Sequence, residues 1–251
     1  MRKLILSIYT LWVAFWFFGF FLMLWPFFWL FLQSKNTHHL AHHCNRVWGF
    51  VVYLFSACLL VVEKKYKTKP NEQYVIVANH TSYLDIPTLY LVFSRKVSFI
   101  GKSSLKKIPL FGYMYSRLHV LVDRKSSESR IKSLDHCRKK IEEGYNMIFF
   151  PEGTISKTAP ILNEFKDGAF KLAIEKQIPI LPVTIPNNWI ILPDKKPLTV
   201  HWNVCKVVVH EPISTLGMTE KDVPRLKSKA FQIIENELKT KLGDEYRQTN
   251  S

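Results

Sequence analysis

Residues 74–85 of the chain read YVIVANHTSYLD. The first five letters, YVIVA, form a short β-branched and apolar run of the kind found in buried strands. The polar string NHTSYLD follows this run without a spacer. In an α/β sheet the reactive groups lie at the carboxyl ends of the strands, so this order makes His80 a candidate reactive residue.

His80 and Asp85 have the residue types of a general base and of the carboxylate that orients it. Five positions along a straight helix rotate about 500°, which leaves the two side chains about 140° apart. We therefore expect them to meet across a turn, with Thr81 or Ser82 capping a helix that begins near Leu84. Asp85 would then fix one ring nitrogen, and the other would be free to take a proton from a substrate hydroxyl. Taken alone, the spacing favours a plainer interpretation, a loop histidine followed by a helix-terminal aspartate.

Beyond residue 70, short β-branched runs alternate with amphipathic stretches, as in an α/β domain. We expect a central sheet of about seven strands, mostly parallel or mixed and flanked by helices, with a helical membrane element at the N-terminus. The predicted strands cover residues 74–78, 97–101, 119–122, 147–150, 180–185, 198–204 and 207–210. The predicted helices cover residues 86–93, 128–143, 168–176 and 219–242.

Three further strings lie beside predicted strands. FPEGTIS, residues 150–156, follows the apolar run NMIFF, and its glycine permits close approach to a ligand. GKSSLKKIPLFG, residues 101–112, is basic and leads to the predicted strand HVLVD and Arg124. ILPVTI, residues 180–185, contains a proline, which argues for an edge strand or an opening in the sheet.

In this order and at this spacing, the four blocks resemble the glycerolipid acyltransferases, the family of the bacterial 1-acyl-sn-glycerol-3-phosphate acyltransferases, over roughly residues 70–190. The resemblance implies that His80 is the general base and that Asp85 orients it. It implies that a thioester of acyl carrier protein or coenzyme A delivers the acyl chain to a lysolipid hydroxyl, with no other cofactor and no metal. The substrate-binding residues that it implies are Lys102, Arg124, Glu152, Gly153 and Thr154.

The chain departs from the family pattern after Thr154, because Ile155 stands where the family usually has arginine. A lysophosphatidate headgroup carries nearly two negative charges, which arginine binds through a planar fork. We expect 1-acylglycerol-3-phosphate as the acceptor and phosphatidate as the product. A lyso-aminolipid, or another lysolipid without a phosphomonoester, is the alternative acceptor. A non-catalytic membrane scaffold is the alternative from a different class.

The N-terminal quarter of the chain predicts membrane attachment. Residues 4–32 carry no charge, and about 20 such residues suffice to cross the hydrocarbon core. Residues 1–62 lack Asp and Glu, a second apolar run covers residues 47–62, and lysines follow it. We expect a retained anchor at residues 1–62, as one spanning helix or a two-helix hairpin, an acyltransferase domain at 63–243 and a C-terminal tail at 244–251. The positive-inside rule then predicts the cytoplasmic face of the inner (plasma) membrane.

The net charge of +15 permits either nucleic acid or an anionic membrane surface as a partner. The Trp and Phe residues near the N-terminus are not interleaved with basic residues, as a groove for nucleic acid requires. We therefore predict the membrane surface and no nucleic acid. HHLAHH, residues 38–43, resembles one metal-binding histidine box, but the sequence has no second cluster. We expect it to face lipid headgroups at the interface rather than to hold a metal.

Overall fold

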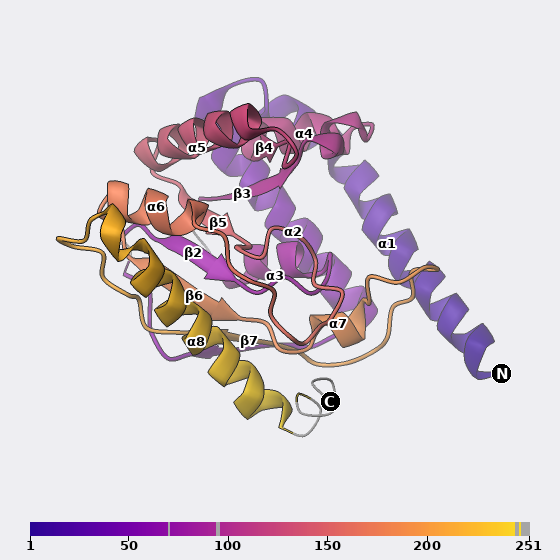
Figure 1. The fold of residues 1–251 in the computed structure, drawn as a ribbon. Coiled ribbons are helices and arrows are strands. Elements are labelled where there is room, and N and C mark those ends of the chain that lie inside the picture. Colours follow the sequence, from indigo (N-terminus) through magenta and orange to yellow (C-terminus); the bar gives the residue numbers. More distant parts are fainter. Residues whose placement is uncertain (70, 94–95, 244–245, 247–251) are drawn as a thin grey trace.

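The structure is a computed structural model that describes residues 1–69, 71–93, 96–243 and 246 (Figure 1). Seven strands form one sheet. In chain order they are β1 (Leu60–Lys64), β2 (Val75–Ala78), β3 (Val97–Lys102), β4 (Val120–Val122), β5 (Asn146–Phe149), β6 (Ile180–Thr184) and β7 (Cys205–Val209). Six of the seven predicted strands have a counterpart within two residues at each end.

The helices of the described part of the chain include all four predicted ones, as α3, α5, α6 and α8. In chain order they are α1 (Arg2–Phe31), α2 (His38–Ser56), α3 (Asp85–Val92), α4 (Phe111–Leu118), α5 (Ser127–Glu142), α6 (Gly168–Glu175), α7 (Asn188–Ile191) and α8 (Val223–Leu242). Helix α5 illustrates how the sequence sets the ends. The Ser126 hydroxyl accepts the Ser129 N–H at the start, and Gly144 adopts a positive φ of 83° just after the last turn.

The strand order is β1-β7-β6-β2-β5-β3-β4. Strands β6, β2, β5, β3 and β4 run parallel to one another, whereas β7 is antiparallel to β6, and β1 runs parallel to β7. The prediction of a mostly parallel, mixed sheet of about seven strands is confirmed. Because parallel strands end on the same side, the segments that follow the five parallel strands leave the sheet at one edge, called the carboxyl edge below.

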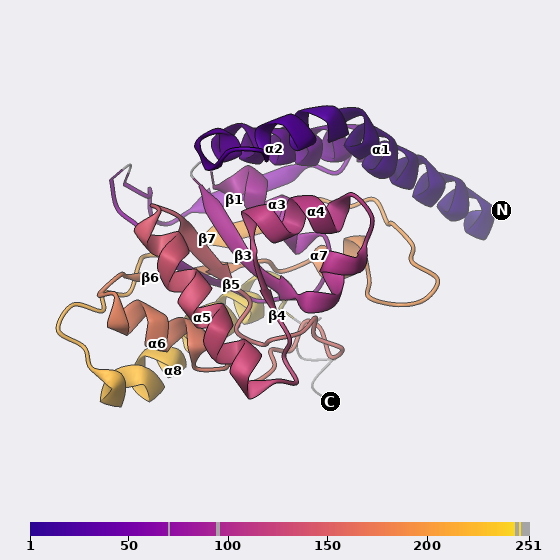
Figure 2. The ribbon, with the colours of Figure 1, turned by 90° about the horizontal axis from the view of Figure 1, so that it is seen from above.

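Strand β2 lies in the middle of the sheet and is buried on both faces. Val75 and Val77 join the hydrophobic cluster of α5, α6 and α8, and Ile76 and Ala78 join that of α2 and α3. Figure 2 shows these two sets of helices on opposite sides of the sheet. Alternate side chains of a strand point to opposite faces, so a strand covered on both sides is apolar throughout, as YVIVA is.

The two N-terminal helices pack against each other, and α2 also packs on α3. The Trp48 indole N–H of α2 donates to the Phe17 carbonyl of α1 at 2.8 Å. Within the described residues, α1 is the helix whose length and composition suffice to cross a membrane, and 11% of its most apolar 18-residue window is buried. Both ribbon views show its N-terminal end reaching past the sheet.

One predicted strand is wrong, and another was missed. Residues 198–204 form no strand, because their polar groups bond outside the sheet. The Val200 N–H donates to Thr10 Oγ1 at 3.1 Å, and the Trp202 indole N–H donates to the Ala57 carbonyl at 2.8 Å. The seventh strand is β1, which pairs with β7. The boundary expected between residues 62 and 63 therefore runs through a strand of the sheet.

Of the two alternatives drawn from the proline, an edge strand or an opening in the sheet, the edge strand is wrong, since β6 lies between β7 and β2. The Pro182 carbonyl accepts the His210 N–H at 3.1 Å, so the proline nitrogen also faces β7. The β6–β7 ladder covers two residue pairs, Val183 with Val209 and Thr184 with Val208. Because the proline nitrogen faces β7, its lack of an N–H costs no hydrogen bond in the ladder between β6 and β2.

The HHLAHH segment is exposed only in part, so at most two of its four histidines can meet the expectation that it faces lipid headgroups. His38 and His42 are buried, whereas His39 and His43 are exposed, because the segment forms the first turns of α2 and one side of that helix packs inward. Of the predicted tail at residues 244–251, residue 246 is described, and the rest lies outside the described residues.

Candidate active site

His80 and Asp85 meet in the turn between β2 and α3. Nδ1 of His80 donates to Oδ2 of Asp85 at 2.9 Å. The same carboxylate oxygen accepts the backbone N–H groups of Thr81 and Ser82 at 2.8 and 3.0 Å. The Ser82 hydroxyl accepts the Leu84 N–H at 3.1 Å, one residue before α3 begins. The contact and the turn expected from the spacing are therefore both present. The expected cap is not, because Leu84 is the N-cap residue of α3 and neither Thr81 nor Ser82 caps the helix with its side chain.

One face of the His80 ring packs against an aromatic side chain, and one of its two nitrogens, Nε2, has no described partner. The ring stacks on Phe150, with ring centroids 4.0 Å apart and planes 16° from parallel. Nε2 has no hydrogen-bond partner among the described residues, and 11% of the side chain is exposed. Because Asp85 accepts from Nδ1–H, the neutral ring carries its lone pair on Nε2. The arrangement leaves one ring nitrogen without a described partner at the carboxyl edge of the sheet.

The second oxygen of Asp85 is bound by a residue that is distant in the sequence. Oδ1 accepts from Nδ2 of Asn188, the first residue of α7, at 2.9 Å. Asp85 is fully buried, and its two oxygens together accept four hydrogen bonds. A buried carboxylate needs such partners, because burial without hydrogen bonds strongly disfavours its charge.

Glu152 links the FPEGTIS block to the His80–Asp85 pair, called the dyad below. Its Oε1 accepts the His80 N–H at 2.7 Å, and its Oε2 accepts the Asn163 N–H at 2.9 Å. Burial raises the pKa of the Glu152 carboxyl to about 7, although the two N–H donors oppose the shift. Ser156, four residues later, donates its backbone N–H to the His80 carbonyl at 2.8 Å. Both oxygens of Glu152 thus bind backbone, so the residue positions the His80 loop.

Gly153 and Thr154 complete the turn that follows β5. Gly153 has a φ of 76°, and its N–H donates to the Phe150 carbonyl at 2.9 Å. The Lys166 side chain lies across this glycine, since a Cβ added there would come within 2.7 Å of the Lys166 Nζ. Thr154 is exposed, and Ile155 is buried. The position that carries arginine in the family pattern therefore points inward in this chain.

Lys102 and Arg124 lie farther along the carboxyl edge, toward β4. Lys102 is the last residue of β3 and pairs in register with Val122, two residues before Arg124. Lys102 is exposed and Arg124 is half-buried. Burial lowers the pKa of the Arg124 guanidinium, and neighbouring Tyr115 opposes the shift. Neither cation forms an ion pair with a residue that the structure describes, and no contact joins either to the dyad.

Two asparagines that sequence reasoning overlooked hold the site together. Asn79 pairs with Ile185 through two hydrogen bonds of 2.8 Å, one to each backbone group, and so fastens the end of β2 to the end of β6. Asn188 binds Asp85. A sequence signal existed for Asn188, because IPNNW follows the strand ILPVT much as ANH follows VIV. Polar residues at the carboxyl ends of two parallel strands meet at the same edge.

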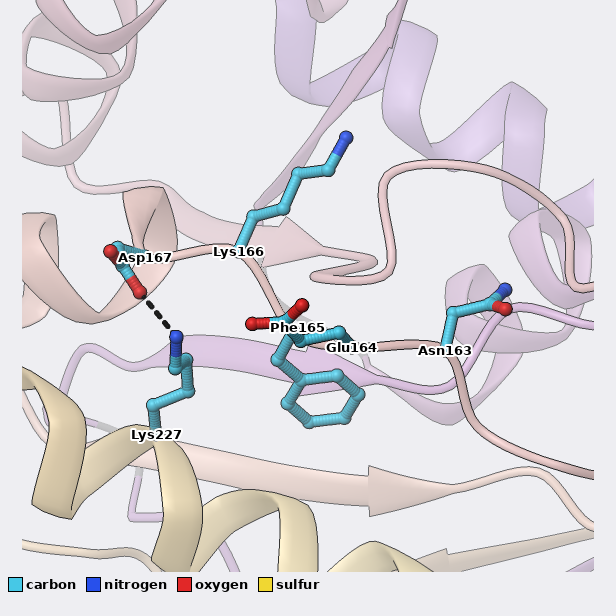
Figure 3. A pocket seen from close by; sticks show the side chains of 6 residues that line it. All are labelled: Asn163, Glu164, Phe165, Lys166, Asp167 and Lys227. Atoms are coloured by element: carbon cyan, nitrogen blue, oxygen red, sulfur yellow. Dashed lines mark hydrogen bonds and ion pairs between the residues drawn. The ribbon is translucent and has the colours of Figure 1, made fainter.

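A separate cavity of about 450 Å³ lies beside the segment that precedes α6 in the chain. It is lined by residues 163–167 and by Lys227 of α8. Figure 3 shows Asp167 paired with Lys227, and Lys166 directed away from that pair. None of the seven predicted site residues lines this cavity. The described residues contain no group of three or more His, Cys, Asp or Glu side chains arranged to hold a metal ion.

The chain resembles known acyltransferases in sequence and in fold. A family model described as Acyltransferase matches residues 60–186, half of the chain. A 1-acyl-sn-glycerol-3-phosphate acyltransferase from Chlamydomonas reinhardtii is 29% identical over 215 residues, which is 85% of this chain and 63% of the relative. A protein of the same name from Saccharomyces cerevisiae is 30% identical over 184 residues, 72% of this chain and 59% of the relative. The chain thus spans about three fifths of the length of these two relatives.

A solved structure supports the fold over nearly the whole chain. The crystal structure of the 1-acyl-sn-glycerophosphate (LPA) acyltransferase PlsC from Thermotoga maritima superposes with a TM-score of 0.78 at 22% sequence identity. The match covers 97% of this chain and 98% of that one. The N-terminal helices are therefore part of the shared fold, together with the sheet.

Proposed function

The chain belongs to the acyltransferase family, and on that premise we propose that it transfers a fatty acyl chain from a thioester to the free hydroxyl of 1-acylglycerol-3-phosphate. The product would be phosphatidate, and the donor a thioester of coenzyme A or acyl carrier protein. The observation that carries the proposal is the His80–Asp85 pair, with Nε2 free of partners within the described structure.

In the proposed reaction His80 acts as the base. Nε2 accepts the proton of the acceptor hydroxyl while that oxygen attacks the thioester carbonyl carbon. The resulting tetrahedral intermediate collapses, the C–S bond breaks, and the leaving thiolate takes the proton back from Nε2. Asp85 keeps the ring in the required tautomer and stabilises the imidazolium that forms between the two steps. The acceptor hydroxyl is the nucleophile, so no covalent acyl-enzyme is needed.

Unpaired cations support a phosphate-bearing acceptor. Lys102, Arg124 and Lys166 lack ion pairs within the described residues, and all three lie on segments that leave the carboxyl edge or cross it. A half-buried guanidinium is suited to a phosphomonoester, which binds its planar fork. The buried Ile155 is the observation that favours the second candidate, a lysolipid acceptor without a phosphomonoester.

We also propose that α1 and the end of α2 attach the enzyme to an anionic membrane at its cytoplasmic face. Many apolar side chains of these helices are exposed, and a neighbouring loop adds Trp202. A concentration of exposed apolar side chains marks an interaction site rather than a solvated face. The exposed residues include Leu4, Ile8, Leu11, Trp12, Phe15, Phe18, Leu22, Phe50 and Leu54.

The test is an acceptor panel with both thioester donors, run on the purified protein in detergent micelles. We expect turnover with 1-acylglycerol-3-phosphate and little with monoacylglycerol or a lyso-aminolipid. His80→Ala should lower kcat by about 10²- to 10⁴-fold. The matched control is His136→Ala, which changes an exposed histidine of α5 and should leave kcat unchanged. Preference for the aminolipid would contradict the proposal that 1-acylglycerol-3-phosphate is the acceptor. An active His80→Ala variant would contradict the proposal that His80 is the base.

A further inference from the structure

We propose that Asn188 is a positioning residue, whose side-chain amide fixes the Asp85 carboxylate so that Oδ2 stays directed at Nδ1 of His80. The inference rests on the proposed role of His80 as the base. It adds a third side chain, from the loop after β6, to a pair that the sequence places within one turn.

The orientation of the Asn188 amide follows from its partners. Nδ2 donates to Asp85 Oδ1 at 2.9 Å and to Thr88 Oγ1 at 3.2 Å, while Oδ1 accepts from the Cys205 thiol at 2.9 Å. Turning the amide over would place its oxygen against the carboxylate. Asn188 is fully buried, so water cannot replace any of these partners. The amide therefore presents a fixed donor to Asp85.

Without that donor, half of the Asp85 carboxylate would be unpaired. Thr81, Ser82 and His80 all donate to Oδ2, and Asn188 is the sole described donor to Oδ1. A buried carboxylate with one oxygen unsatisfied gains by rotating toward another donor or by concentrating its charge on the paired oxygen. Rotation misaligns the imidazole, and concentrated charge on Oδ2 stabilises the imidazolium.

The contact also reaches the N-terminal helices. The Thr88 hydroxyl donates to the Leu84 carbonyl at 2.7 Å and accepts from the Tyr53 hydroxyl of α2 at 2.5 Å and from Asn188. Each of these groups has a partner, so the network has no free donor through which it would rearrange. Asp85, the first residue of α3, is thus held by Asn188 of α7, and Asn188 is linked through Thr88 to Tyr53 of α2.

The neighbouring residue supplies a matched control. Asn187 is also buried, but its amide donates to the Val204 carbonyl and accepts the Lys206 N–H at 3.0 Å. Both of its partners are backbone groups beside β7, and no contact joins it to Asp85 in the described structure. Replacing Asn187 removes part-buried side-chain hydrogen bonds from the same loop without touching the dyad.

The experiment compares Asn188→Leu and Asn188→Asp with Asn187→Leu and Asn187→Asp, in the purified protein in micelles. We expect the Asn188 variants to lower kcat by about 10- to 100-fold with an unchanged KM. The acid limb of their pH–rate profile should move, to higher pH where charge concentrates on Oδ2 and to lower pH where the carboxylate rotates away from Nδ1. The Asn187 variants should lower the melting temperature and leave the pH profile in place. Equal profiles for the two positions would overturn the proposal.

Two further measurements keep the test decisive. If Asn188→Leu does not fold, Cys205→Ala removes the thiol that orients the amide and should also move the acid limb; an unmoved limb contradicts the proposal. The second measurement needs no substrate. The low-field NMR resonance of His80 Nδ1–H, assigned by its loss in His80→Ala, should shift in Asn188→Leu and stay in place in Asn187→Leu. This readout separates a failure of the positioning role from a failure of the proposed function.

Discussion

The carboxyl edge of the sheet carries two contrasting groups of polar side chains. Beside β2, the carboxylates of Asp85 and Glu152 and the amides of Asn79 and Asn188 all have partners within the protein. Three cations have no ion pair with a described residue: Lys102 and Arg124, which lie toward β4, and Lys166, which lies in the segment before α6. Paired groups hold a geometry before any ligand arrives, whereas an unpaired cation is available to an anion from outside. The groups that position His80 and the cations that we propose to bind the substrate anion thus lie at different parts of one edge.

Glu152→Gln changes one of the paired groups beside β2. Its expected effect, a loss of folding stability, is the largest of those predicted here. The pKa of Glu152 is raised from 4.5 to about 7, so the native protein binds its proton more tightly than the unfolded chain does. The stability from this group is complete below pH 4.5 and is lost as the pH rises through 7, a change of about 3 kcal/mol. We therefore expect the unfolding free energy of the wild type, relative to Glu152→Gln, to fall by that amount over this range.

Unfolding in detergent at a series of pH values from 4.5 to 8 measures this difference. The control is Glu164→Gln, which changes an exposed glutamate of the neighbouring segment and should give a difference that does not depend on pH. A pH-independent difference for Glu152→Gln would contradict the assignment of a raised pKa to this carboxyl.

Arg124→Met tests whether an unpaired cation of the carboxyl edge binds the substrate phosphate. We expect KM for 1-acylglycerol-3-phosphate to rise about 10- to 100-fold with little change in kcat, because a charge-assisted phosphate contact is lost. KM for monoacylglycerol, which lacks the phosphate, should not change. Lys125→Met, at the exposed neighbouring position, is the matched control. An equal rise in KM for both acceptors would show that Arg124 supports the fold rather than the phosphate.

Lys166→Met carries the smallest expected effect and sharpens the same distinction. Lys166 is exposed and lies across Gly153, so we expect KM for the phosphate acceptor to rise about two- to fivefold at low salt. The effect should shrink as salt screens the charge. Lys171→Met, on the exposed side of α6, should leave KM unchanged. A salt-independent change would point to lost packing of the lysine stem over the glycine.

The sequence predicts those parts of the fold whose signals are local. Strands β2 and β5 contain the short apolar runs VIVA and MIF, and each begins and ends within a residue of its prediction. Strand β1 was missed because α2 and β1 share one apolar run. The break between them is Ala57, which adopts a left-handed conformation with φ 53°. An alanine gives no turn signal, in contrast to a glycine or asparagine at such a position.

The candidate site divides in the same way. His80 and Asp85 could be paired from their spacing, because a turn brings near neighbours together. Asn188 lies 103 residues from Asp85 along the chain and reaches it only because β6 is adjacent to β2 in the sheet. Glu152 was expected to bind substrate, but its oxygens bind two backbone N–H groups. Residue type and order do not reveal which partner a carboxylate finds after folding.

The position of β1 limits how the chain can be shortened to make a more soluble protein. A truncation that removes residues 1–62 deletes three of the five residues of β1 and leaves β7 as the edge of the sheet. Exposed edge strands pair with other chains, so such a fragment should aggregate even though its dyad is intact. A cut inside the left-handed bend at Ala57 keeps β1 whole but exposes the surface of α3 that α2 covers. Solubility is better sought by replacing exposed apolar residues of α1 than by shortening the chain.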